Sequence, residues 1–332
     1  MRKRTKTLLT GAGAAAAGIA AMGAATYAST KYLVRMAMDR KQPKIPGMEK
    51  TLERLRGSEE CRAFLDAIIE SAEKIESKPH DVVTIAGADG EKLVGHWFAC
   101  PNAKRILVAM HGWRSSWSSD FGTIADFWHS HGCSVLYAEQ RGQGSSGGDY
   151  IGFGLTERFD CLSWIQWVNG RNSEHLPIYL AGVSMGATTV LMAAALDLPE
   201  NVKGIMADCG FTSARDIWQH VAEKNLHMHY RIHGPIANRL CKARIQMRPD
   251  AYSTIEALER SSVPVLLAHG AQDRFVPVEM TYENYRVCKA PKRLLIVPGA
   301  DHGMSHYVEK QRYETAMEEF WQEYDQNRML NN

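Results

Sequence analysis

The sequence predicts an α/β fold in which a mostly parallel central sheet is flanked by helices. Two observations lead to this prediction. Short apolar runs that end in loops alternate with segments of helical character between residues 106 and 298, a pattern typical of sheets built from strand–helix–strand units. In addition, Gly182-Val183-Ser184-Met185-Gly186 lies between the apolar run Ile178–Ala181 and the apolar run Ala187–Ala195. A serine between two glycines at a strand–turn–helix junction is typical of an exposed nucleophile in such a fold.

The chain begins with a segment unlike the rest. Basic residues within Arg2–Lys6 precede an uncharged stretch of 24 residues, Thr7–Thr30, that is rich in alanine and glycine. This order is typical of a signal peptide or signal anchor, and 24 residues can span a bilayer. An alanine-rich helix is the alternative, because alanine and glycine are only weakly hydrophobic. No small-x-small cleavage site stands out, so we predict that residues 1–30 form a retained single-pass anchor. We expect the remaining chain to lie on the extracytoplasmic side. Because basic residues flank the stretch on both sides, a location of the remaining chain on the cytoplasmic side stays the alternative.

A connector, residues 31–78, is expected to follow the anchor. It contains a break at Gln42–Gly47, where two prolines and a glycine interrupt helical character. From Glu49 to Lys78 a charged amphipathic pattern predicts a helix. Because every candidate catalytic residue lies beyond residue 100, we expect a chain that begins near Lys44 to be soluble and active. The main domain is predicted over residues 79–328.

The main domain is expected to open with a β-hairpin and to continue with parallel strands. Two runs of strand character flank Asp89-Gly90, a dipeptide that favours the tight turns of hairpins. The segment at residues 213–262 has helical character and predicts a cap, an insertion that covers the site. Six apolar runs around that segment predict the parallel strands, at residues 106–110, 134–138, 178–181, 202–207, 265–270 and 293–298.

Three residues of the predicted cap, Trp218, Met228 and Tyr230, are candidates to line an apolar substrate pocket. For each of them, a place in the core of the cap is an equally good interpretation. His229 and His233 have the spacing of metal ligands on one helix face, but no carboxylate or cysteine nearby completes a set. Seven scattered cysteines without a Cys-x-x-Cys pair indicate free thiols. We therefore expect neither a metal nor an organic cofactor.

The candidate catalytic residues follow strands in the chain order Ser, Asp, His. Ser184 is the candidate nucleophile. Asp273 follows the fifth of the six apolar runs and His302 follows the sixth, and sites in parallel sheets form at such strand ends. We expect His302 to act as general base and then acid, and Asp273 to orient and stabilise its imidazolium. Asp208, which follows the fourth run, is the alternative acid, whereas Asp301 is expected to shape its loop.

Two backbone N–H groups are expected to bind the oxyanion that develops during acyl transfer. One belongs to Met185, the residue after the nucleophile, and the other to Trp113, in the His-Gly-Trp loop after the first of the six runs. Loss of one such donor typically costs about 3 kcal/mol of transition-state stabilisation. The sequence therefore predicts an oxyanion hole made by Trp113 and Met185.

With these motifs the chain resembles the α/β-hydrolase superfamily, in the serine-aminopeptidase-like and bacterial esterase-like branch with an N-terminal hydrophobic segment. The resemblance rests on motifs spread over the whole predicted domain, namely His111–Trp113, Glu139–Ser146, Gly182–Gly186, Asp273 with Val276-Pro277, and Gly299–His302. It implies an α/β-hydrolase fold with a helical cap insertion. It also implies hydrolysis of an ester, thioester or amide, and leaves the substrate open.

Composition agrees with a single sizeable domain plus a terminal extension. The chain has 332 residues, of which 45% are hydrophobic and 23% charged, and its net charge is +2. Such values are near the average of globular domains. A charge so close to zero, without a basic stripe beyond the terminus, argues against a nucleic-acid partner.

We therefore predict a serine hydrolase that cleaves a carboxylic ester or thioester through an acyl-enzyme. Its expected partners are a small ester or peptide substrate and, through the N-terminal segment, a membrane. A serine peptidase of the aminopeptidase-like type is the second interpretation, and a catalytically silent binding protein on the same scaffold is the third. An aminopeptidase needs cap carboxylates to hold a free amine, and the cap offers few, namely Asp216, Glu223, Asp250, Glu256 and Glu259.

Overall fold

The fold is built on an eight-stranded sheet in the order β1-β2-β4-β3-β5-β6-β7-β8. The computed structural model describes residues 2–43 and 59–325. β1 and β2 form an antiparallel hairpin, β2 is antiparallel to β4, and the other neighbours are parallel. The mostly parallel sheet and the hairpin around Asp89-Gly90 are thus confirmed. The strands are β1 (Asp81–Ala86), β2 (Lys92–Phe98), β3 (Arg105–Met110), β4 (Cys133–Glu139), β5 (Ile178–Val183), β6 (Val202–Asp208), β7 (Val265–Gly270) and β8 (Lys292–Val297).

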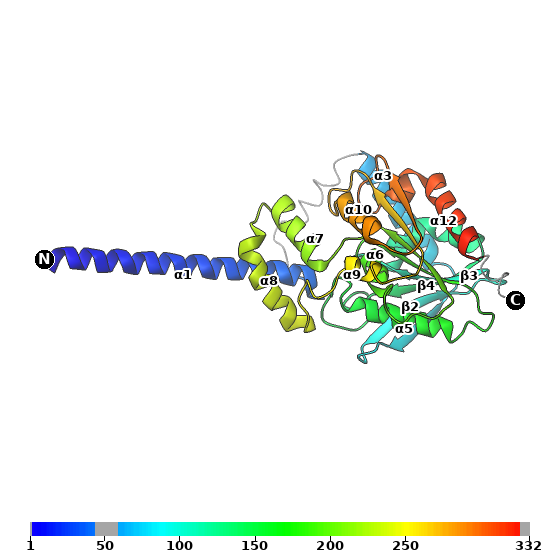
Figure 1. Cartoon of the computed structure of the whole chain (residues 1–332), viewed down its shortest axis with the longest axis horizontal. Helices are drawn as coiled ribbons and strands as arrows, with labels where there is room; N and C mark the ends of the chain where they lie inside the picture. Colours follow the sequence, from blue (N-terminus) through cyan, green and yellow to red (C-terminus); the bar gives the residue numbers. More distant parts are fainter. Residues whose placement is uncertain (1, 44–58, 326–332) are drawn as a thin grey trace.

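Helices connect the strands and cover the sheet (Figure 1). The amphipathic helix expected within residues 49–78 is α3, and residues 49–58 lie outside the described part of the chain. The helices are α1 (Arg2–Met38), α3 (Glu59–Glu76), α4 (Trp117–Ser130), α5 (Glu157–Asn169), α6 (Met185–Ala193), α7 (Ala214–His220), the π-helical turn η1 (Val221–Asn225), α8 (Tyr230–Ile245), α9 (Thr254–Leu258), α10 (Val278–Val287), α11 (Ser305–Val308) and α12 (Lys310–Asp325).

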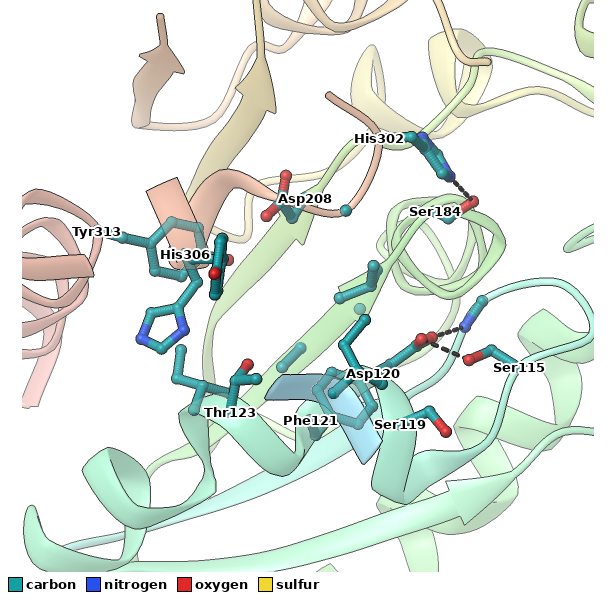
Figure 2. Close-up of a pocket in the computed structure, with 18 of the residues that line it drawn as sticks. Ser115, Ser119, Asp120, Phe121, Thr123, Ser184, Asp208, His302, His306 and Tyr313 are labelled. Atoms are coloured by element: carbon teal, nitrogen blue, oxygen red, sulfur yellow. Dashed lines mark hydrogen bonds between the residues drawn. The ribbon is translucent and has the colours of Figure 1, made fainter. Parts of the chain in front are cut away.

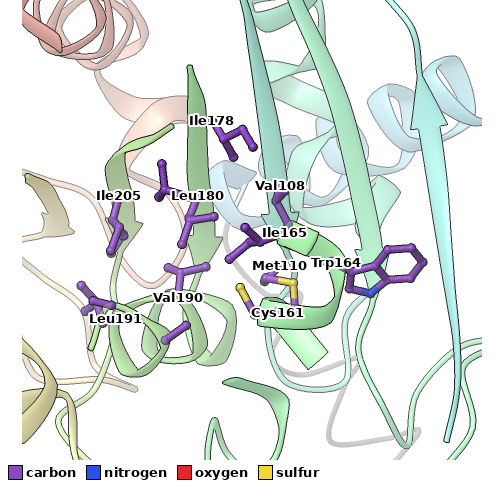
Figure 3. Close-up of a cluster of buried hydrophobic side chains, with 14 of the residues drawn as sticks. Val108, Met110, Cys161, Trp164, Ile165, Ile178, Leu180, Val190, Leu191 and Ile205 are labelled. Carbon is purple, nitrogen blue, oxygen red and sulfur yellow. The ribbon is translucent and has the colours of Figure 1, made fainter. Parts of the chain in front are cut away.

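Alternate residues of the central strands face opposite helical layers. In β3, Ile106, Val108 and Met110 pack with side chains of α5 and α6, whereas Leu107 and Ala109 pack with those of α4 and α12. Successive side chains of a strand point to opposite faces of the sheet, so β3 is buried along its whole length. Figure 3 shows the first cluster, which also contains Cys161, Trp164, Ile165, Val190 and Leu191.

The helical insertion expected at residues 213–262 lies between β6 and β7. Two of its helices, α7 and α8, extend beyond the sheet and form the cap, together with η1 (Figure 1). Their side chains form an apolar cluster that includes Ile217, Ala237 and Cys241. The last helix of the insertion, α9, instead packs against α6 and α10, so it belongs to the helical layer of the sheet.

The carboxyl-terminal part of α1 packs against the main domain, although the sequence predicts a connector there. Val34 and Met38 are buried, and Met38 is fully so. Asp39 forms an antiparallel bridge with Tyr150, and Arg40 donates through Nη2 to the Gly144 carbonyl oxygen at 2.6 Å. These partners lie more than 100 residues away in sequence, so no local pattern could reveal them. Residues 30–40 are therefore part of the main domain.

The uncharged stretch Thr7–Thr30, for which the sequence predicts a membrane anchor, lies within α1. Within residues 2–43 and 59–325, no helix combines the length and the apolar character needed to cross a membrane.

Candidate active site

Ser184 lies at a sharp turn between β5 and α6. Its φ of 54° and ψ of −118° place a non-glycine residue at positive φ, a strained conformation that is concentrated at functional sites. The two motif glycines permit the turn, because a side chain at Gly182 would overlap the Gly186 carbonyl and one at Gly186 would overlap the Met110 carbonyl. The backbone N–H of Ser184 donates to the Asp208 carbonyl oxygen at 2.8 Å. This turn fixes the direction of the hydroxyl.

His302 reaches Ser184 from the loop after β8 (Figure 2). Its Nε2 lies 2.9 Å from Ser184 Oγ, and its Nδ1 lies 2.6 Å from Asp273 Oδ2. Because a carboxylate only accepts, Nδ1 carries the proton and Nε2 is free to accept one from the serine hydroxyl. The Asp273 side chain is fully buried, whereas a quarter of the His302 side chain remains exposed. The three residues thus have the order and contacts of a Ser–His–Asp triad.

Asp273 is held by four hydrogen bonds. Its Oδ1 accepts the backbone N–H groups of Phe275 at 2.8 Å and Val276 at 2.9 Å. Its Oδ2 accepts from His302 and, at 3.0 Å, from His269 Nε2. Burial alone would raise the pKa of Asp273, but the hydrogen bonds from the two histidines outweigh it and hold this pKa well below its ordinary value. The carboxylate is therefore ionised at neutral pH.

The same contacts act on His302. Burial opposes protonation of the imidazole, whereas Cys209 and the Asp273 carboxylate favour it, and the net effect raises the pKa of His302 well above its ordinary value of 6.5. An imidazolium formed at this position is thus stabilised. A general base that becomes a cation during the reaction needs this property.

His269 supports the acid and was not among the residues expected to function. It lies on β7, fully buried, and its Nε2 faces two acceptors at 3.0 Å, Asp273 Oδ2 and the Val276 carbonyl oxygen. Nε2 therefore carries a proton, and Nδ1 accepts from the Thr281 hydroxyl at 2.6 Å. In the sequence, only its spacing of four residues from Asp273 hints at this contact.

The alternative acid, Asp208, faces another partner. Its Oδ1 accepts from Ser305 Oγ at 2.9 Å, and Figure 2 shows it beside Tyr313 rather than in line with His302. Asp301 shapes its loop, because its Oδ1 accepts the backbone N–H groups of Arg274 at 3.0 Å and His302 at 2.8 Å. The geometry therefore pairs His302 with Asp273.

The loop after β3 lies against the nucleophile. A Cβ at Gly112 would lie 3.3 Å from the Ser184 Cβ. On either side of Trp113 the backbone N–H groups are occupied, that of Gly112 by Asp120 Oδ2 at 2.6 Å and that of Arg114 by Gln143 Oε1 at 2.5 Å. The N–H groups of Trp113 itself and of Met185, at the first position of α6, have no acceptor within the described residues. Both remain available for the predicted oxyanion hole.

Two cavities meet at Ser184. The larger, of about 330 Å³, is lined by His302 and by polar residues that include Ser119, Asp120, Asp208 and His306 (Figure 2). The smaller, of about 200 Å³, is almost wholly apolar and lies between α1 and the cap. Trp113 lines both.

The predicted pocket residues are only partly brought together. Trp218 and Tyr230 line the smaller cavity. Met228 lines neither cavity, and its backbone N–H donates to the Ala222 carbonyl oxygen at 2.7 Å. Met228 follows η1 in the segment that leads into α8, and it is not among the residues that line the apolar cavity with its two predicted companions.

Cys209 completes a group of three potential metal ligands. Its Sγ, a carboxylate oxygen of Asp273 and a ring nitrogen of His302 lie within 4.8 Å of one another, a proximity that no other His, Cys, Asp or Glu trio reaches in the described part of the chain. Burial raises the pKa of the Cys209 thiol to about 11, whereas metals bind the thiolate. Because Asp273 and His302 also bind each other, the arrangement fits proton transfer better than metal binding.

Comparisons with known proteins agree with the interpretation of this chain as a hydrolase. The sequence model of the X-Pro dipeptidyl-peptidase (S15 family) matches residues 40–233, which include Ser184 and Trp113 but neither Asp273 nor His302. YqkD of Bacillus subtilis is similar at 25% identity over 257 residues, which cover 76% of this chain and 82% of YqkD.

Two solved structures share the fold. An esterase of Pyrococcus furiosus is similar with a TM-score of 0.61 at 20% identity, over 76% of this chain and 93% of the esterase. A puromycin-hydrolyzing peptidase of Mycobacterium tuberculosis is similar with a TM-score of 0.57 at 19% identity, over 74% of this chain and 39% of the peptidase. Enzymes described as an esterase and as a peptidase thus have the same architecture.

Proposed function

Since this chain belongs to the X-Pro dipeptidyl-peptidase (S15) family of serine hydrolases, we propose that it hydrolyses carboxylic esters or thioesters through an acyl-enzyme formed on Ser184. The observation that carries this proposal is the chain of contacts from Ser184 Oγ through His302 to Asp273, at 2.9 and 2.6 Å. These distances suit proton transfer and the orientation of a general base.

The proposed reaction follows from these contacts. Ser184 Oγ attacks the carbonyl carbon while His302 Nε2 accepts the hydroxyl proton, and the carbonyl oxygen becomes an oxyanion that the N–H groups of Trp113 and Met185 stabilise. His302 then donates its proton to the oxygen of the leaving alcohol, and the ester C–O bond breaks. In the second half, His302 removes a proton from water as the water oxygen attacks the acyl carbon. The bond from that carbon to Ser184 Oγ then breaks, His302 returns the proton to Ser184 Oγ, and the acid is released.

The charges around the cavities favour an ester over a peptide with a free amino terminus. A carboxylate is the partner that binds a charged amino terminus most strongly. The larger cavity contains Asp120 and Asp208, but Asp120 accepts from Gly112 and Ser115 and Asp208 accepts from Ser305. None of the described residues that line the smaller cavity is acidic. An ester needs no such anchor.

The acidic residues of the cap also have other roles. Asp216 accepts from Ser213 and Thr212 at the start of α7, and Asp250 pairs with Arg248. Glu256 lies at the start of α9 and accepts from Ser253. These carboxylates of the inserted segment 213–262 line neither cavity, so they do not supply the amine anchor that the peptidase alternative needs.

A labelling experiment combined with two substrates tests the proposal. We expect a fluorophosphonate to modify the wild-type protein once, at Ser184, and to leave Ser184→Ala unmodified. We expect kcat/KM on p-nitrophenyl butyrate to exceed that on alanyl-prolyl-p-nitroanilide, and Ser184→Ala to lose at least 10³-fold of the esterase activity, as typical for a triad nucleophile. A preference for the dipeptide substrate would favour the peptidase alternative. A wild-type protein that neither labels nor turns over either substrate would favour the silent scaffold.

A further inference from the structure

One face of α1 forms a wall of the apolar cavity beside the nucleophile. Thr30, Leu33, Val34 and Ala37 line this cavity together with Ser184. Their spacing of three, four and seven residues places them on one side of a helix. The N-terminal helix thus reaches the active site, although its lining residues lie about 150 positions before the nucleophile.

The opposite wall comes from the cap, through Ile217, Trp218, Val221 and Ala222. Two polar side chains of the cavity satisfy each other, because the Thr30 hydroxyl donates to the Thr26 carbonyl oxygen at 2.7 Å and lies 2.6 Å from His233 Nδ1. Within residues 2–43 and 59–325, no aspartate, glutamate, lysine or arginine lines this cavity. The cavity therefore suits a hydrocarbon group rather than a charged one.

Specific hydrogen bonds hold α1 in this place. Trp113 Nε1 donates to the Ala37 carbonyl oxygen at 2.8 Å, and Arg114 Nη2 donates to the Met36 carbonyl oxygen at 2.7 Å. Arg244 of α8 binds Asp39 at 2.7 Å. The helix end is thus tied both to the loop of the proposed oxyanion hole and to the cap.

The two cavities differ in their access to His302. His302 lines the larger cavity but not the smaller one. In the proposed reaction the alcohol oxygen receives its proton from His302, so the alcohol must lie on the side of the larger cavity. The smaller cavity is left for the acyl group, which stays attached to Ser184 Oγ after the alcohol departs.

We propose that the apolar cavity between α1 and the cap binds the acyl chain of the substrate, and that α1 determines the chain length accepted. This inference rests on the proposed esterase function. A cavity of about 150 Å³ holds a benzene molecule, so the volume of about 200 Å³ accommodates an acyl chain of roughly six to eight carbons.

The test uses p-nitrophenyl esters from acetate to dodecanoate with the full-length protein. We expect kcat/KM of the wild type to rise about fourfold for each methylene until the cavity is full, and then to level off. Leu33→Trp fills the cavity from α1 and Ala222→Phe fills it from the cap. In each, we expect the ratio of kcat/KM on octanoate to that on acetate to fall at least 50-fold, since about three methylenes lose their place.

Tyr32→Trp is the matched control, because Tyr32 is an exposed neighbour on α1 that lines neither cavity. It should leave the octanoate-to-acetate ratio unchanged. Melting temperatures of all variants show whether they fold. A merely structural role of the cavity would lower both rates equally and leave the ratio intact in Leu33→Trp and Ala222→Phe, and this result would overturn the inference.

Three other outcomes separate this inference from the esterase proposal. A wild-type protein that labels at Ser184 and hydrolyses acetate and octanoate equally well would overturn the acyl-chain site alone. Alkyl acetates, in which the alcohol chain is varied instead of the acyl chain, give a further comparison. A chain-length effect seen only with these esters, and removed by Leu33→Trp, would place the alcohol in this cavity and equally overturn its assignment to the acyl chain. Absence of labelling and of ester hydrolysis would instead overturn the esterase proposal.

Discussion

Replacement of Asp273 by asparagine tests the proposed acid most directly. The buried carboxylate accepts from His302 Nδ1 at 2.6 Å, from His269 and from two backbone N–H groups. An amide has one acceptor oxygen and presents an NH₂ group to at least one of these donors. In Asp273→Asn, His302 is expected to carry its proton on Nε2, where it can no longer accept the Ser184 proton.

The expected loss is about 10³- to 10⁴-fold in kcat, or roughly 4–5 kcal/mol of transition-state stabilisation. It has two sources, the wrong tautomer and the loss of a charge 2.6 Å from the developing imidazolium. The assay is hydrolysis of p-nitrophenyl butyrate, with a melting curve to show that the variant folds.

Asp208→Asn is the matched control, because it makes the same change at the alternative acid. Asp208 accepts from Ser305, so we expect a lower melting temperature and less than a tenfold change in kcat/KM. A folded Asp273→Asn protein that keeps more than a tenth of its activity would contradict the assignment. So would a folded Asp208→Asn protein that is the more impaired of the two.

Four further expectations can be tested, three of which come from the structure and one from the sequence. His302 must be neutral to accept a proton, and its pKa is raised, so kcat/KM should fall with decreasing pH around a midpoint above 6.5. Asp273→Asn should move this midpoint to lower pH, and an unmoved midpoint would contradict the role of the carboxylate. His269→Phe should lower kcat with little change in KM. Because His269 acts through Asp273, this variant should also move the midpoint of the pH dependence of kcat/KM that reports the titration of His302. A chain that begins at residue 44 should lose at least tenfold in activity, unlike one that begins at residue 20, because residues 30–40 pack on the domain. Equal activities of the two would instead agree with the expectation from the sequence that a chain beginning near Lys44 is active. The membrane anchor stays a prediction, and fractionation of full-length protein and of the chain that begins at residue 20 tests it. Recovery of uncleaved full-length protein in the soluble fraction would contradict it.

Local sequence patterns predicted the strands, the hairpin and the turn that holds Ser184. They suffice for these features because side-chain periodicity and the steric freedom of glycine act within a few residues. The strand ends also indicated Asp273 and His302, since parallel strands bring their carboxyl ends to one edge of the sheet.

Other features depend on contacts that no local pattern encodes. The sequence left both Asp208 and Asp273 as possible acids, because both follow strands, and only the paths of two separate loops bring Asp273 to His302 and Asp208 to Ser305. The role of His269 and the place of α1 were likewise missed. Thr30 meets His233 across 203 positions of sequence, and Trp113 binds Ala37 across 76. Such pairs form only when the whole chain has folded, so the wall of the apolar cavity was decided by tertiary packing.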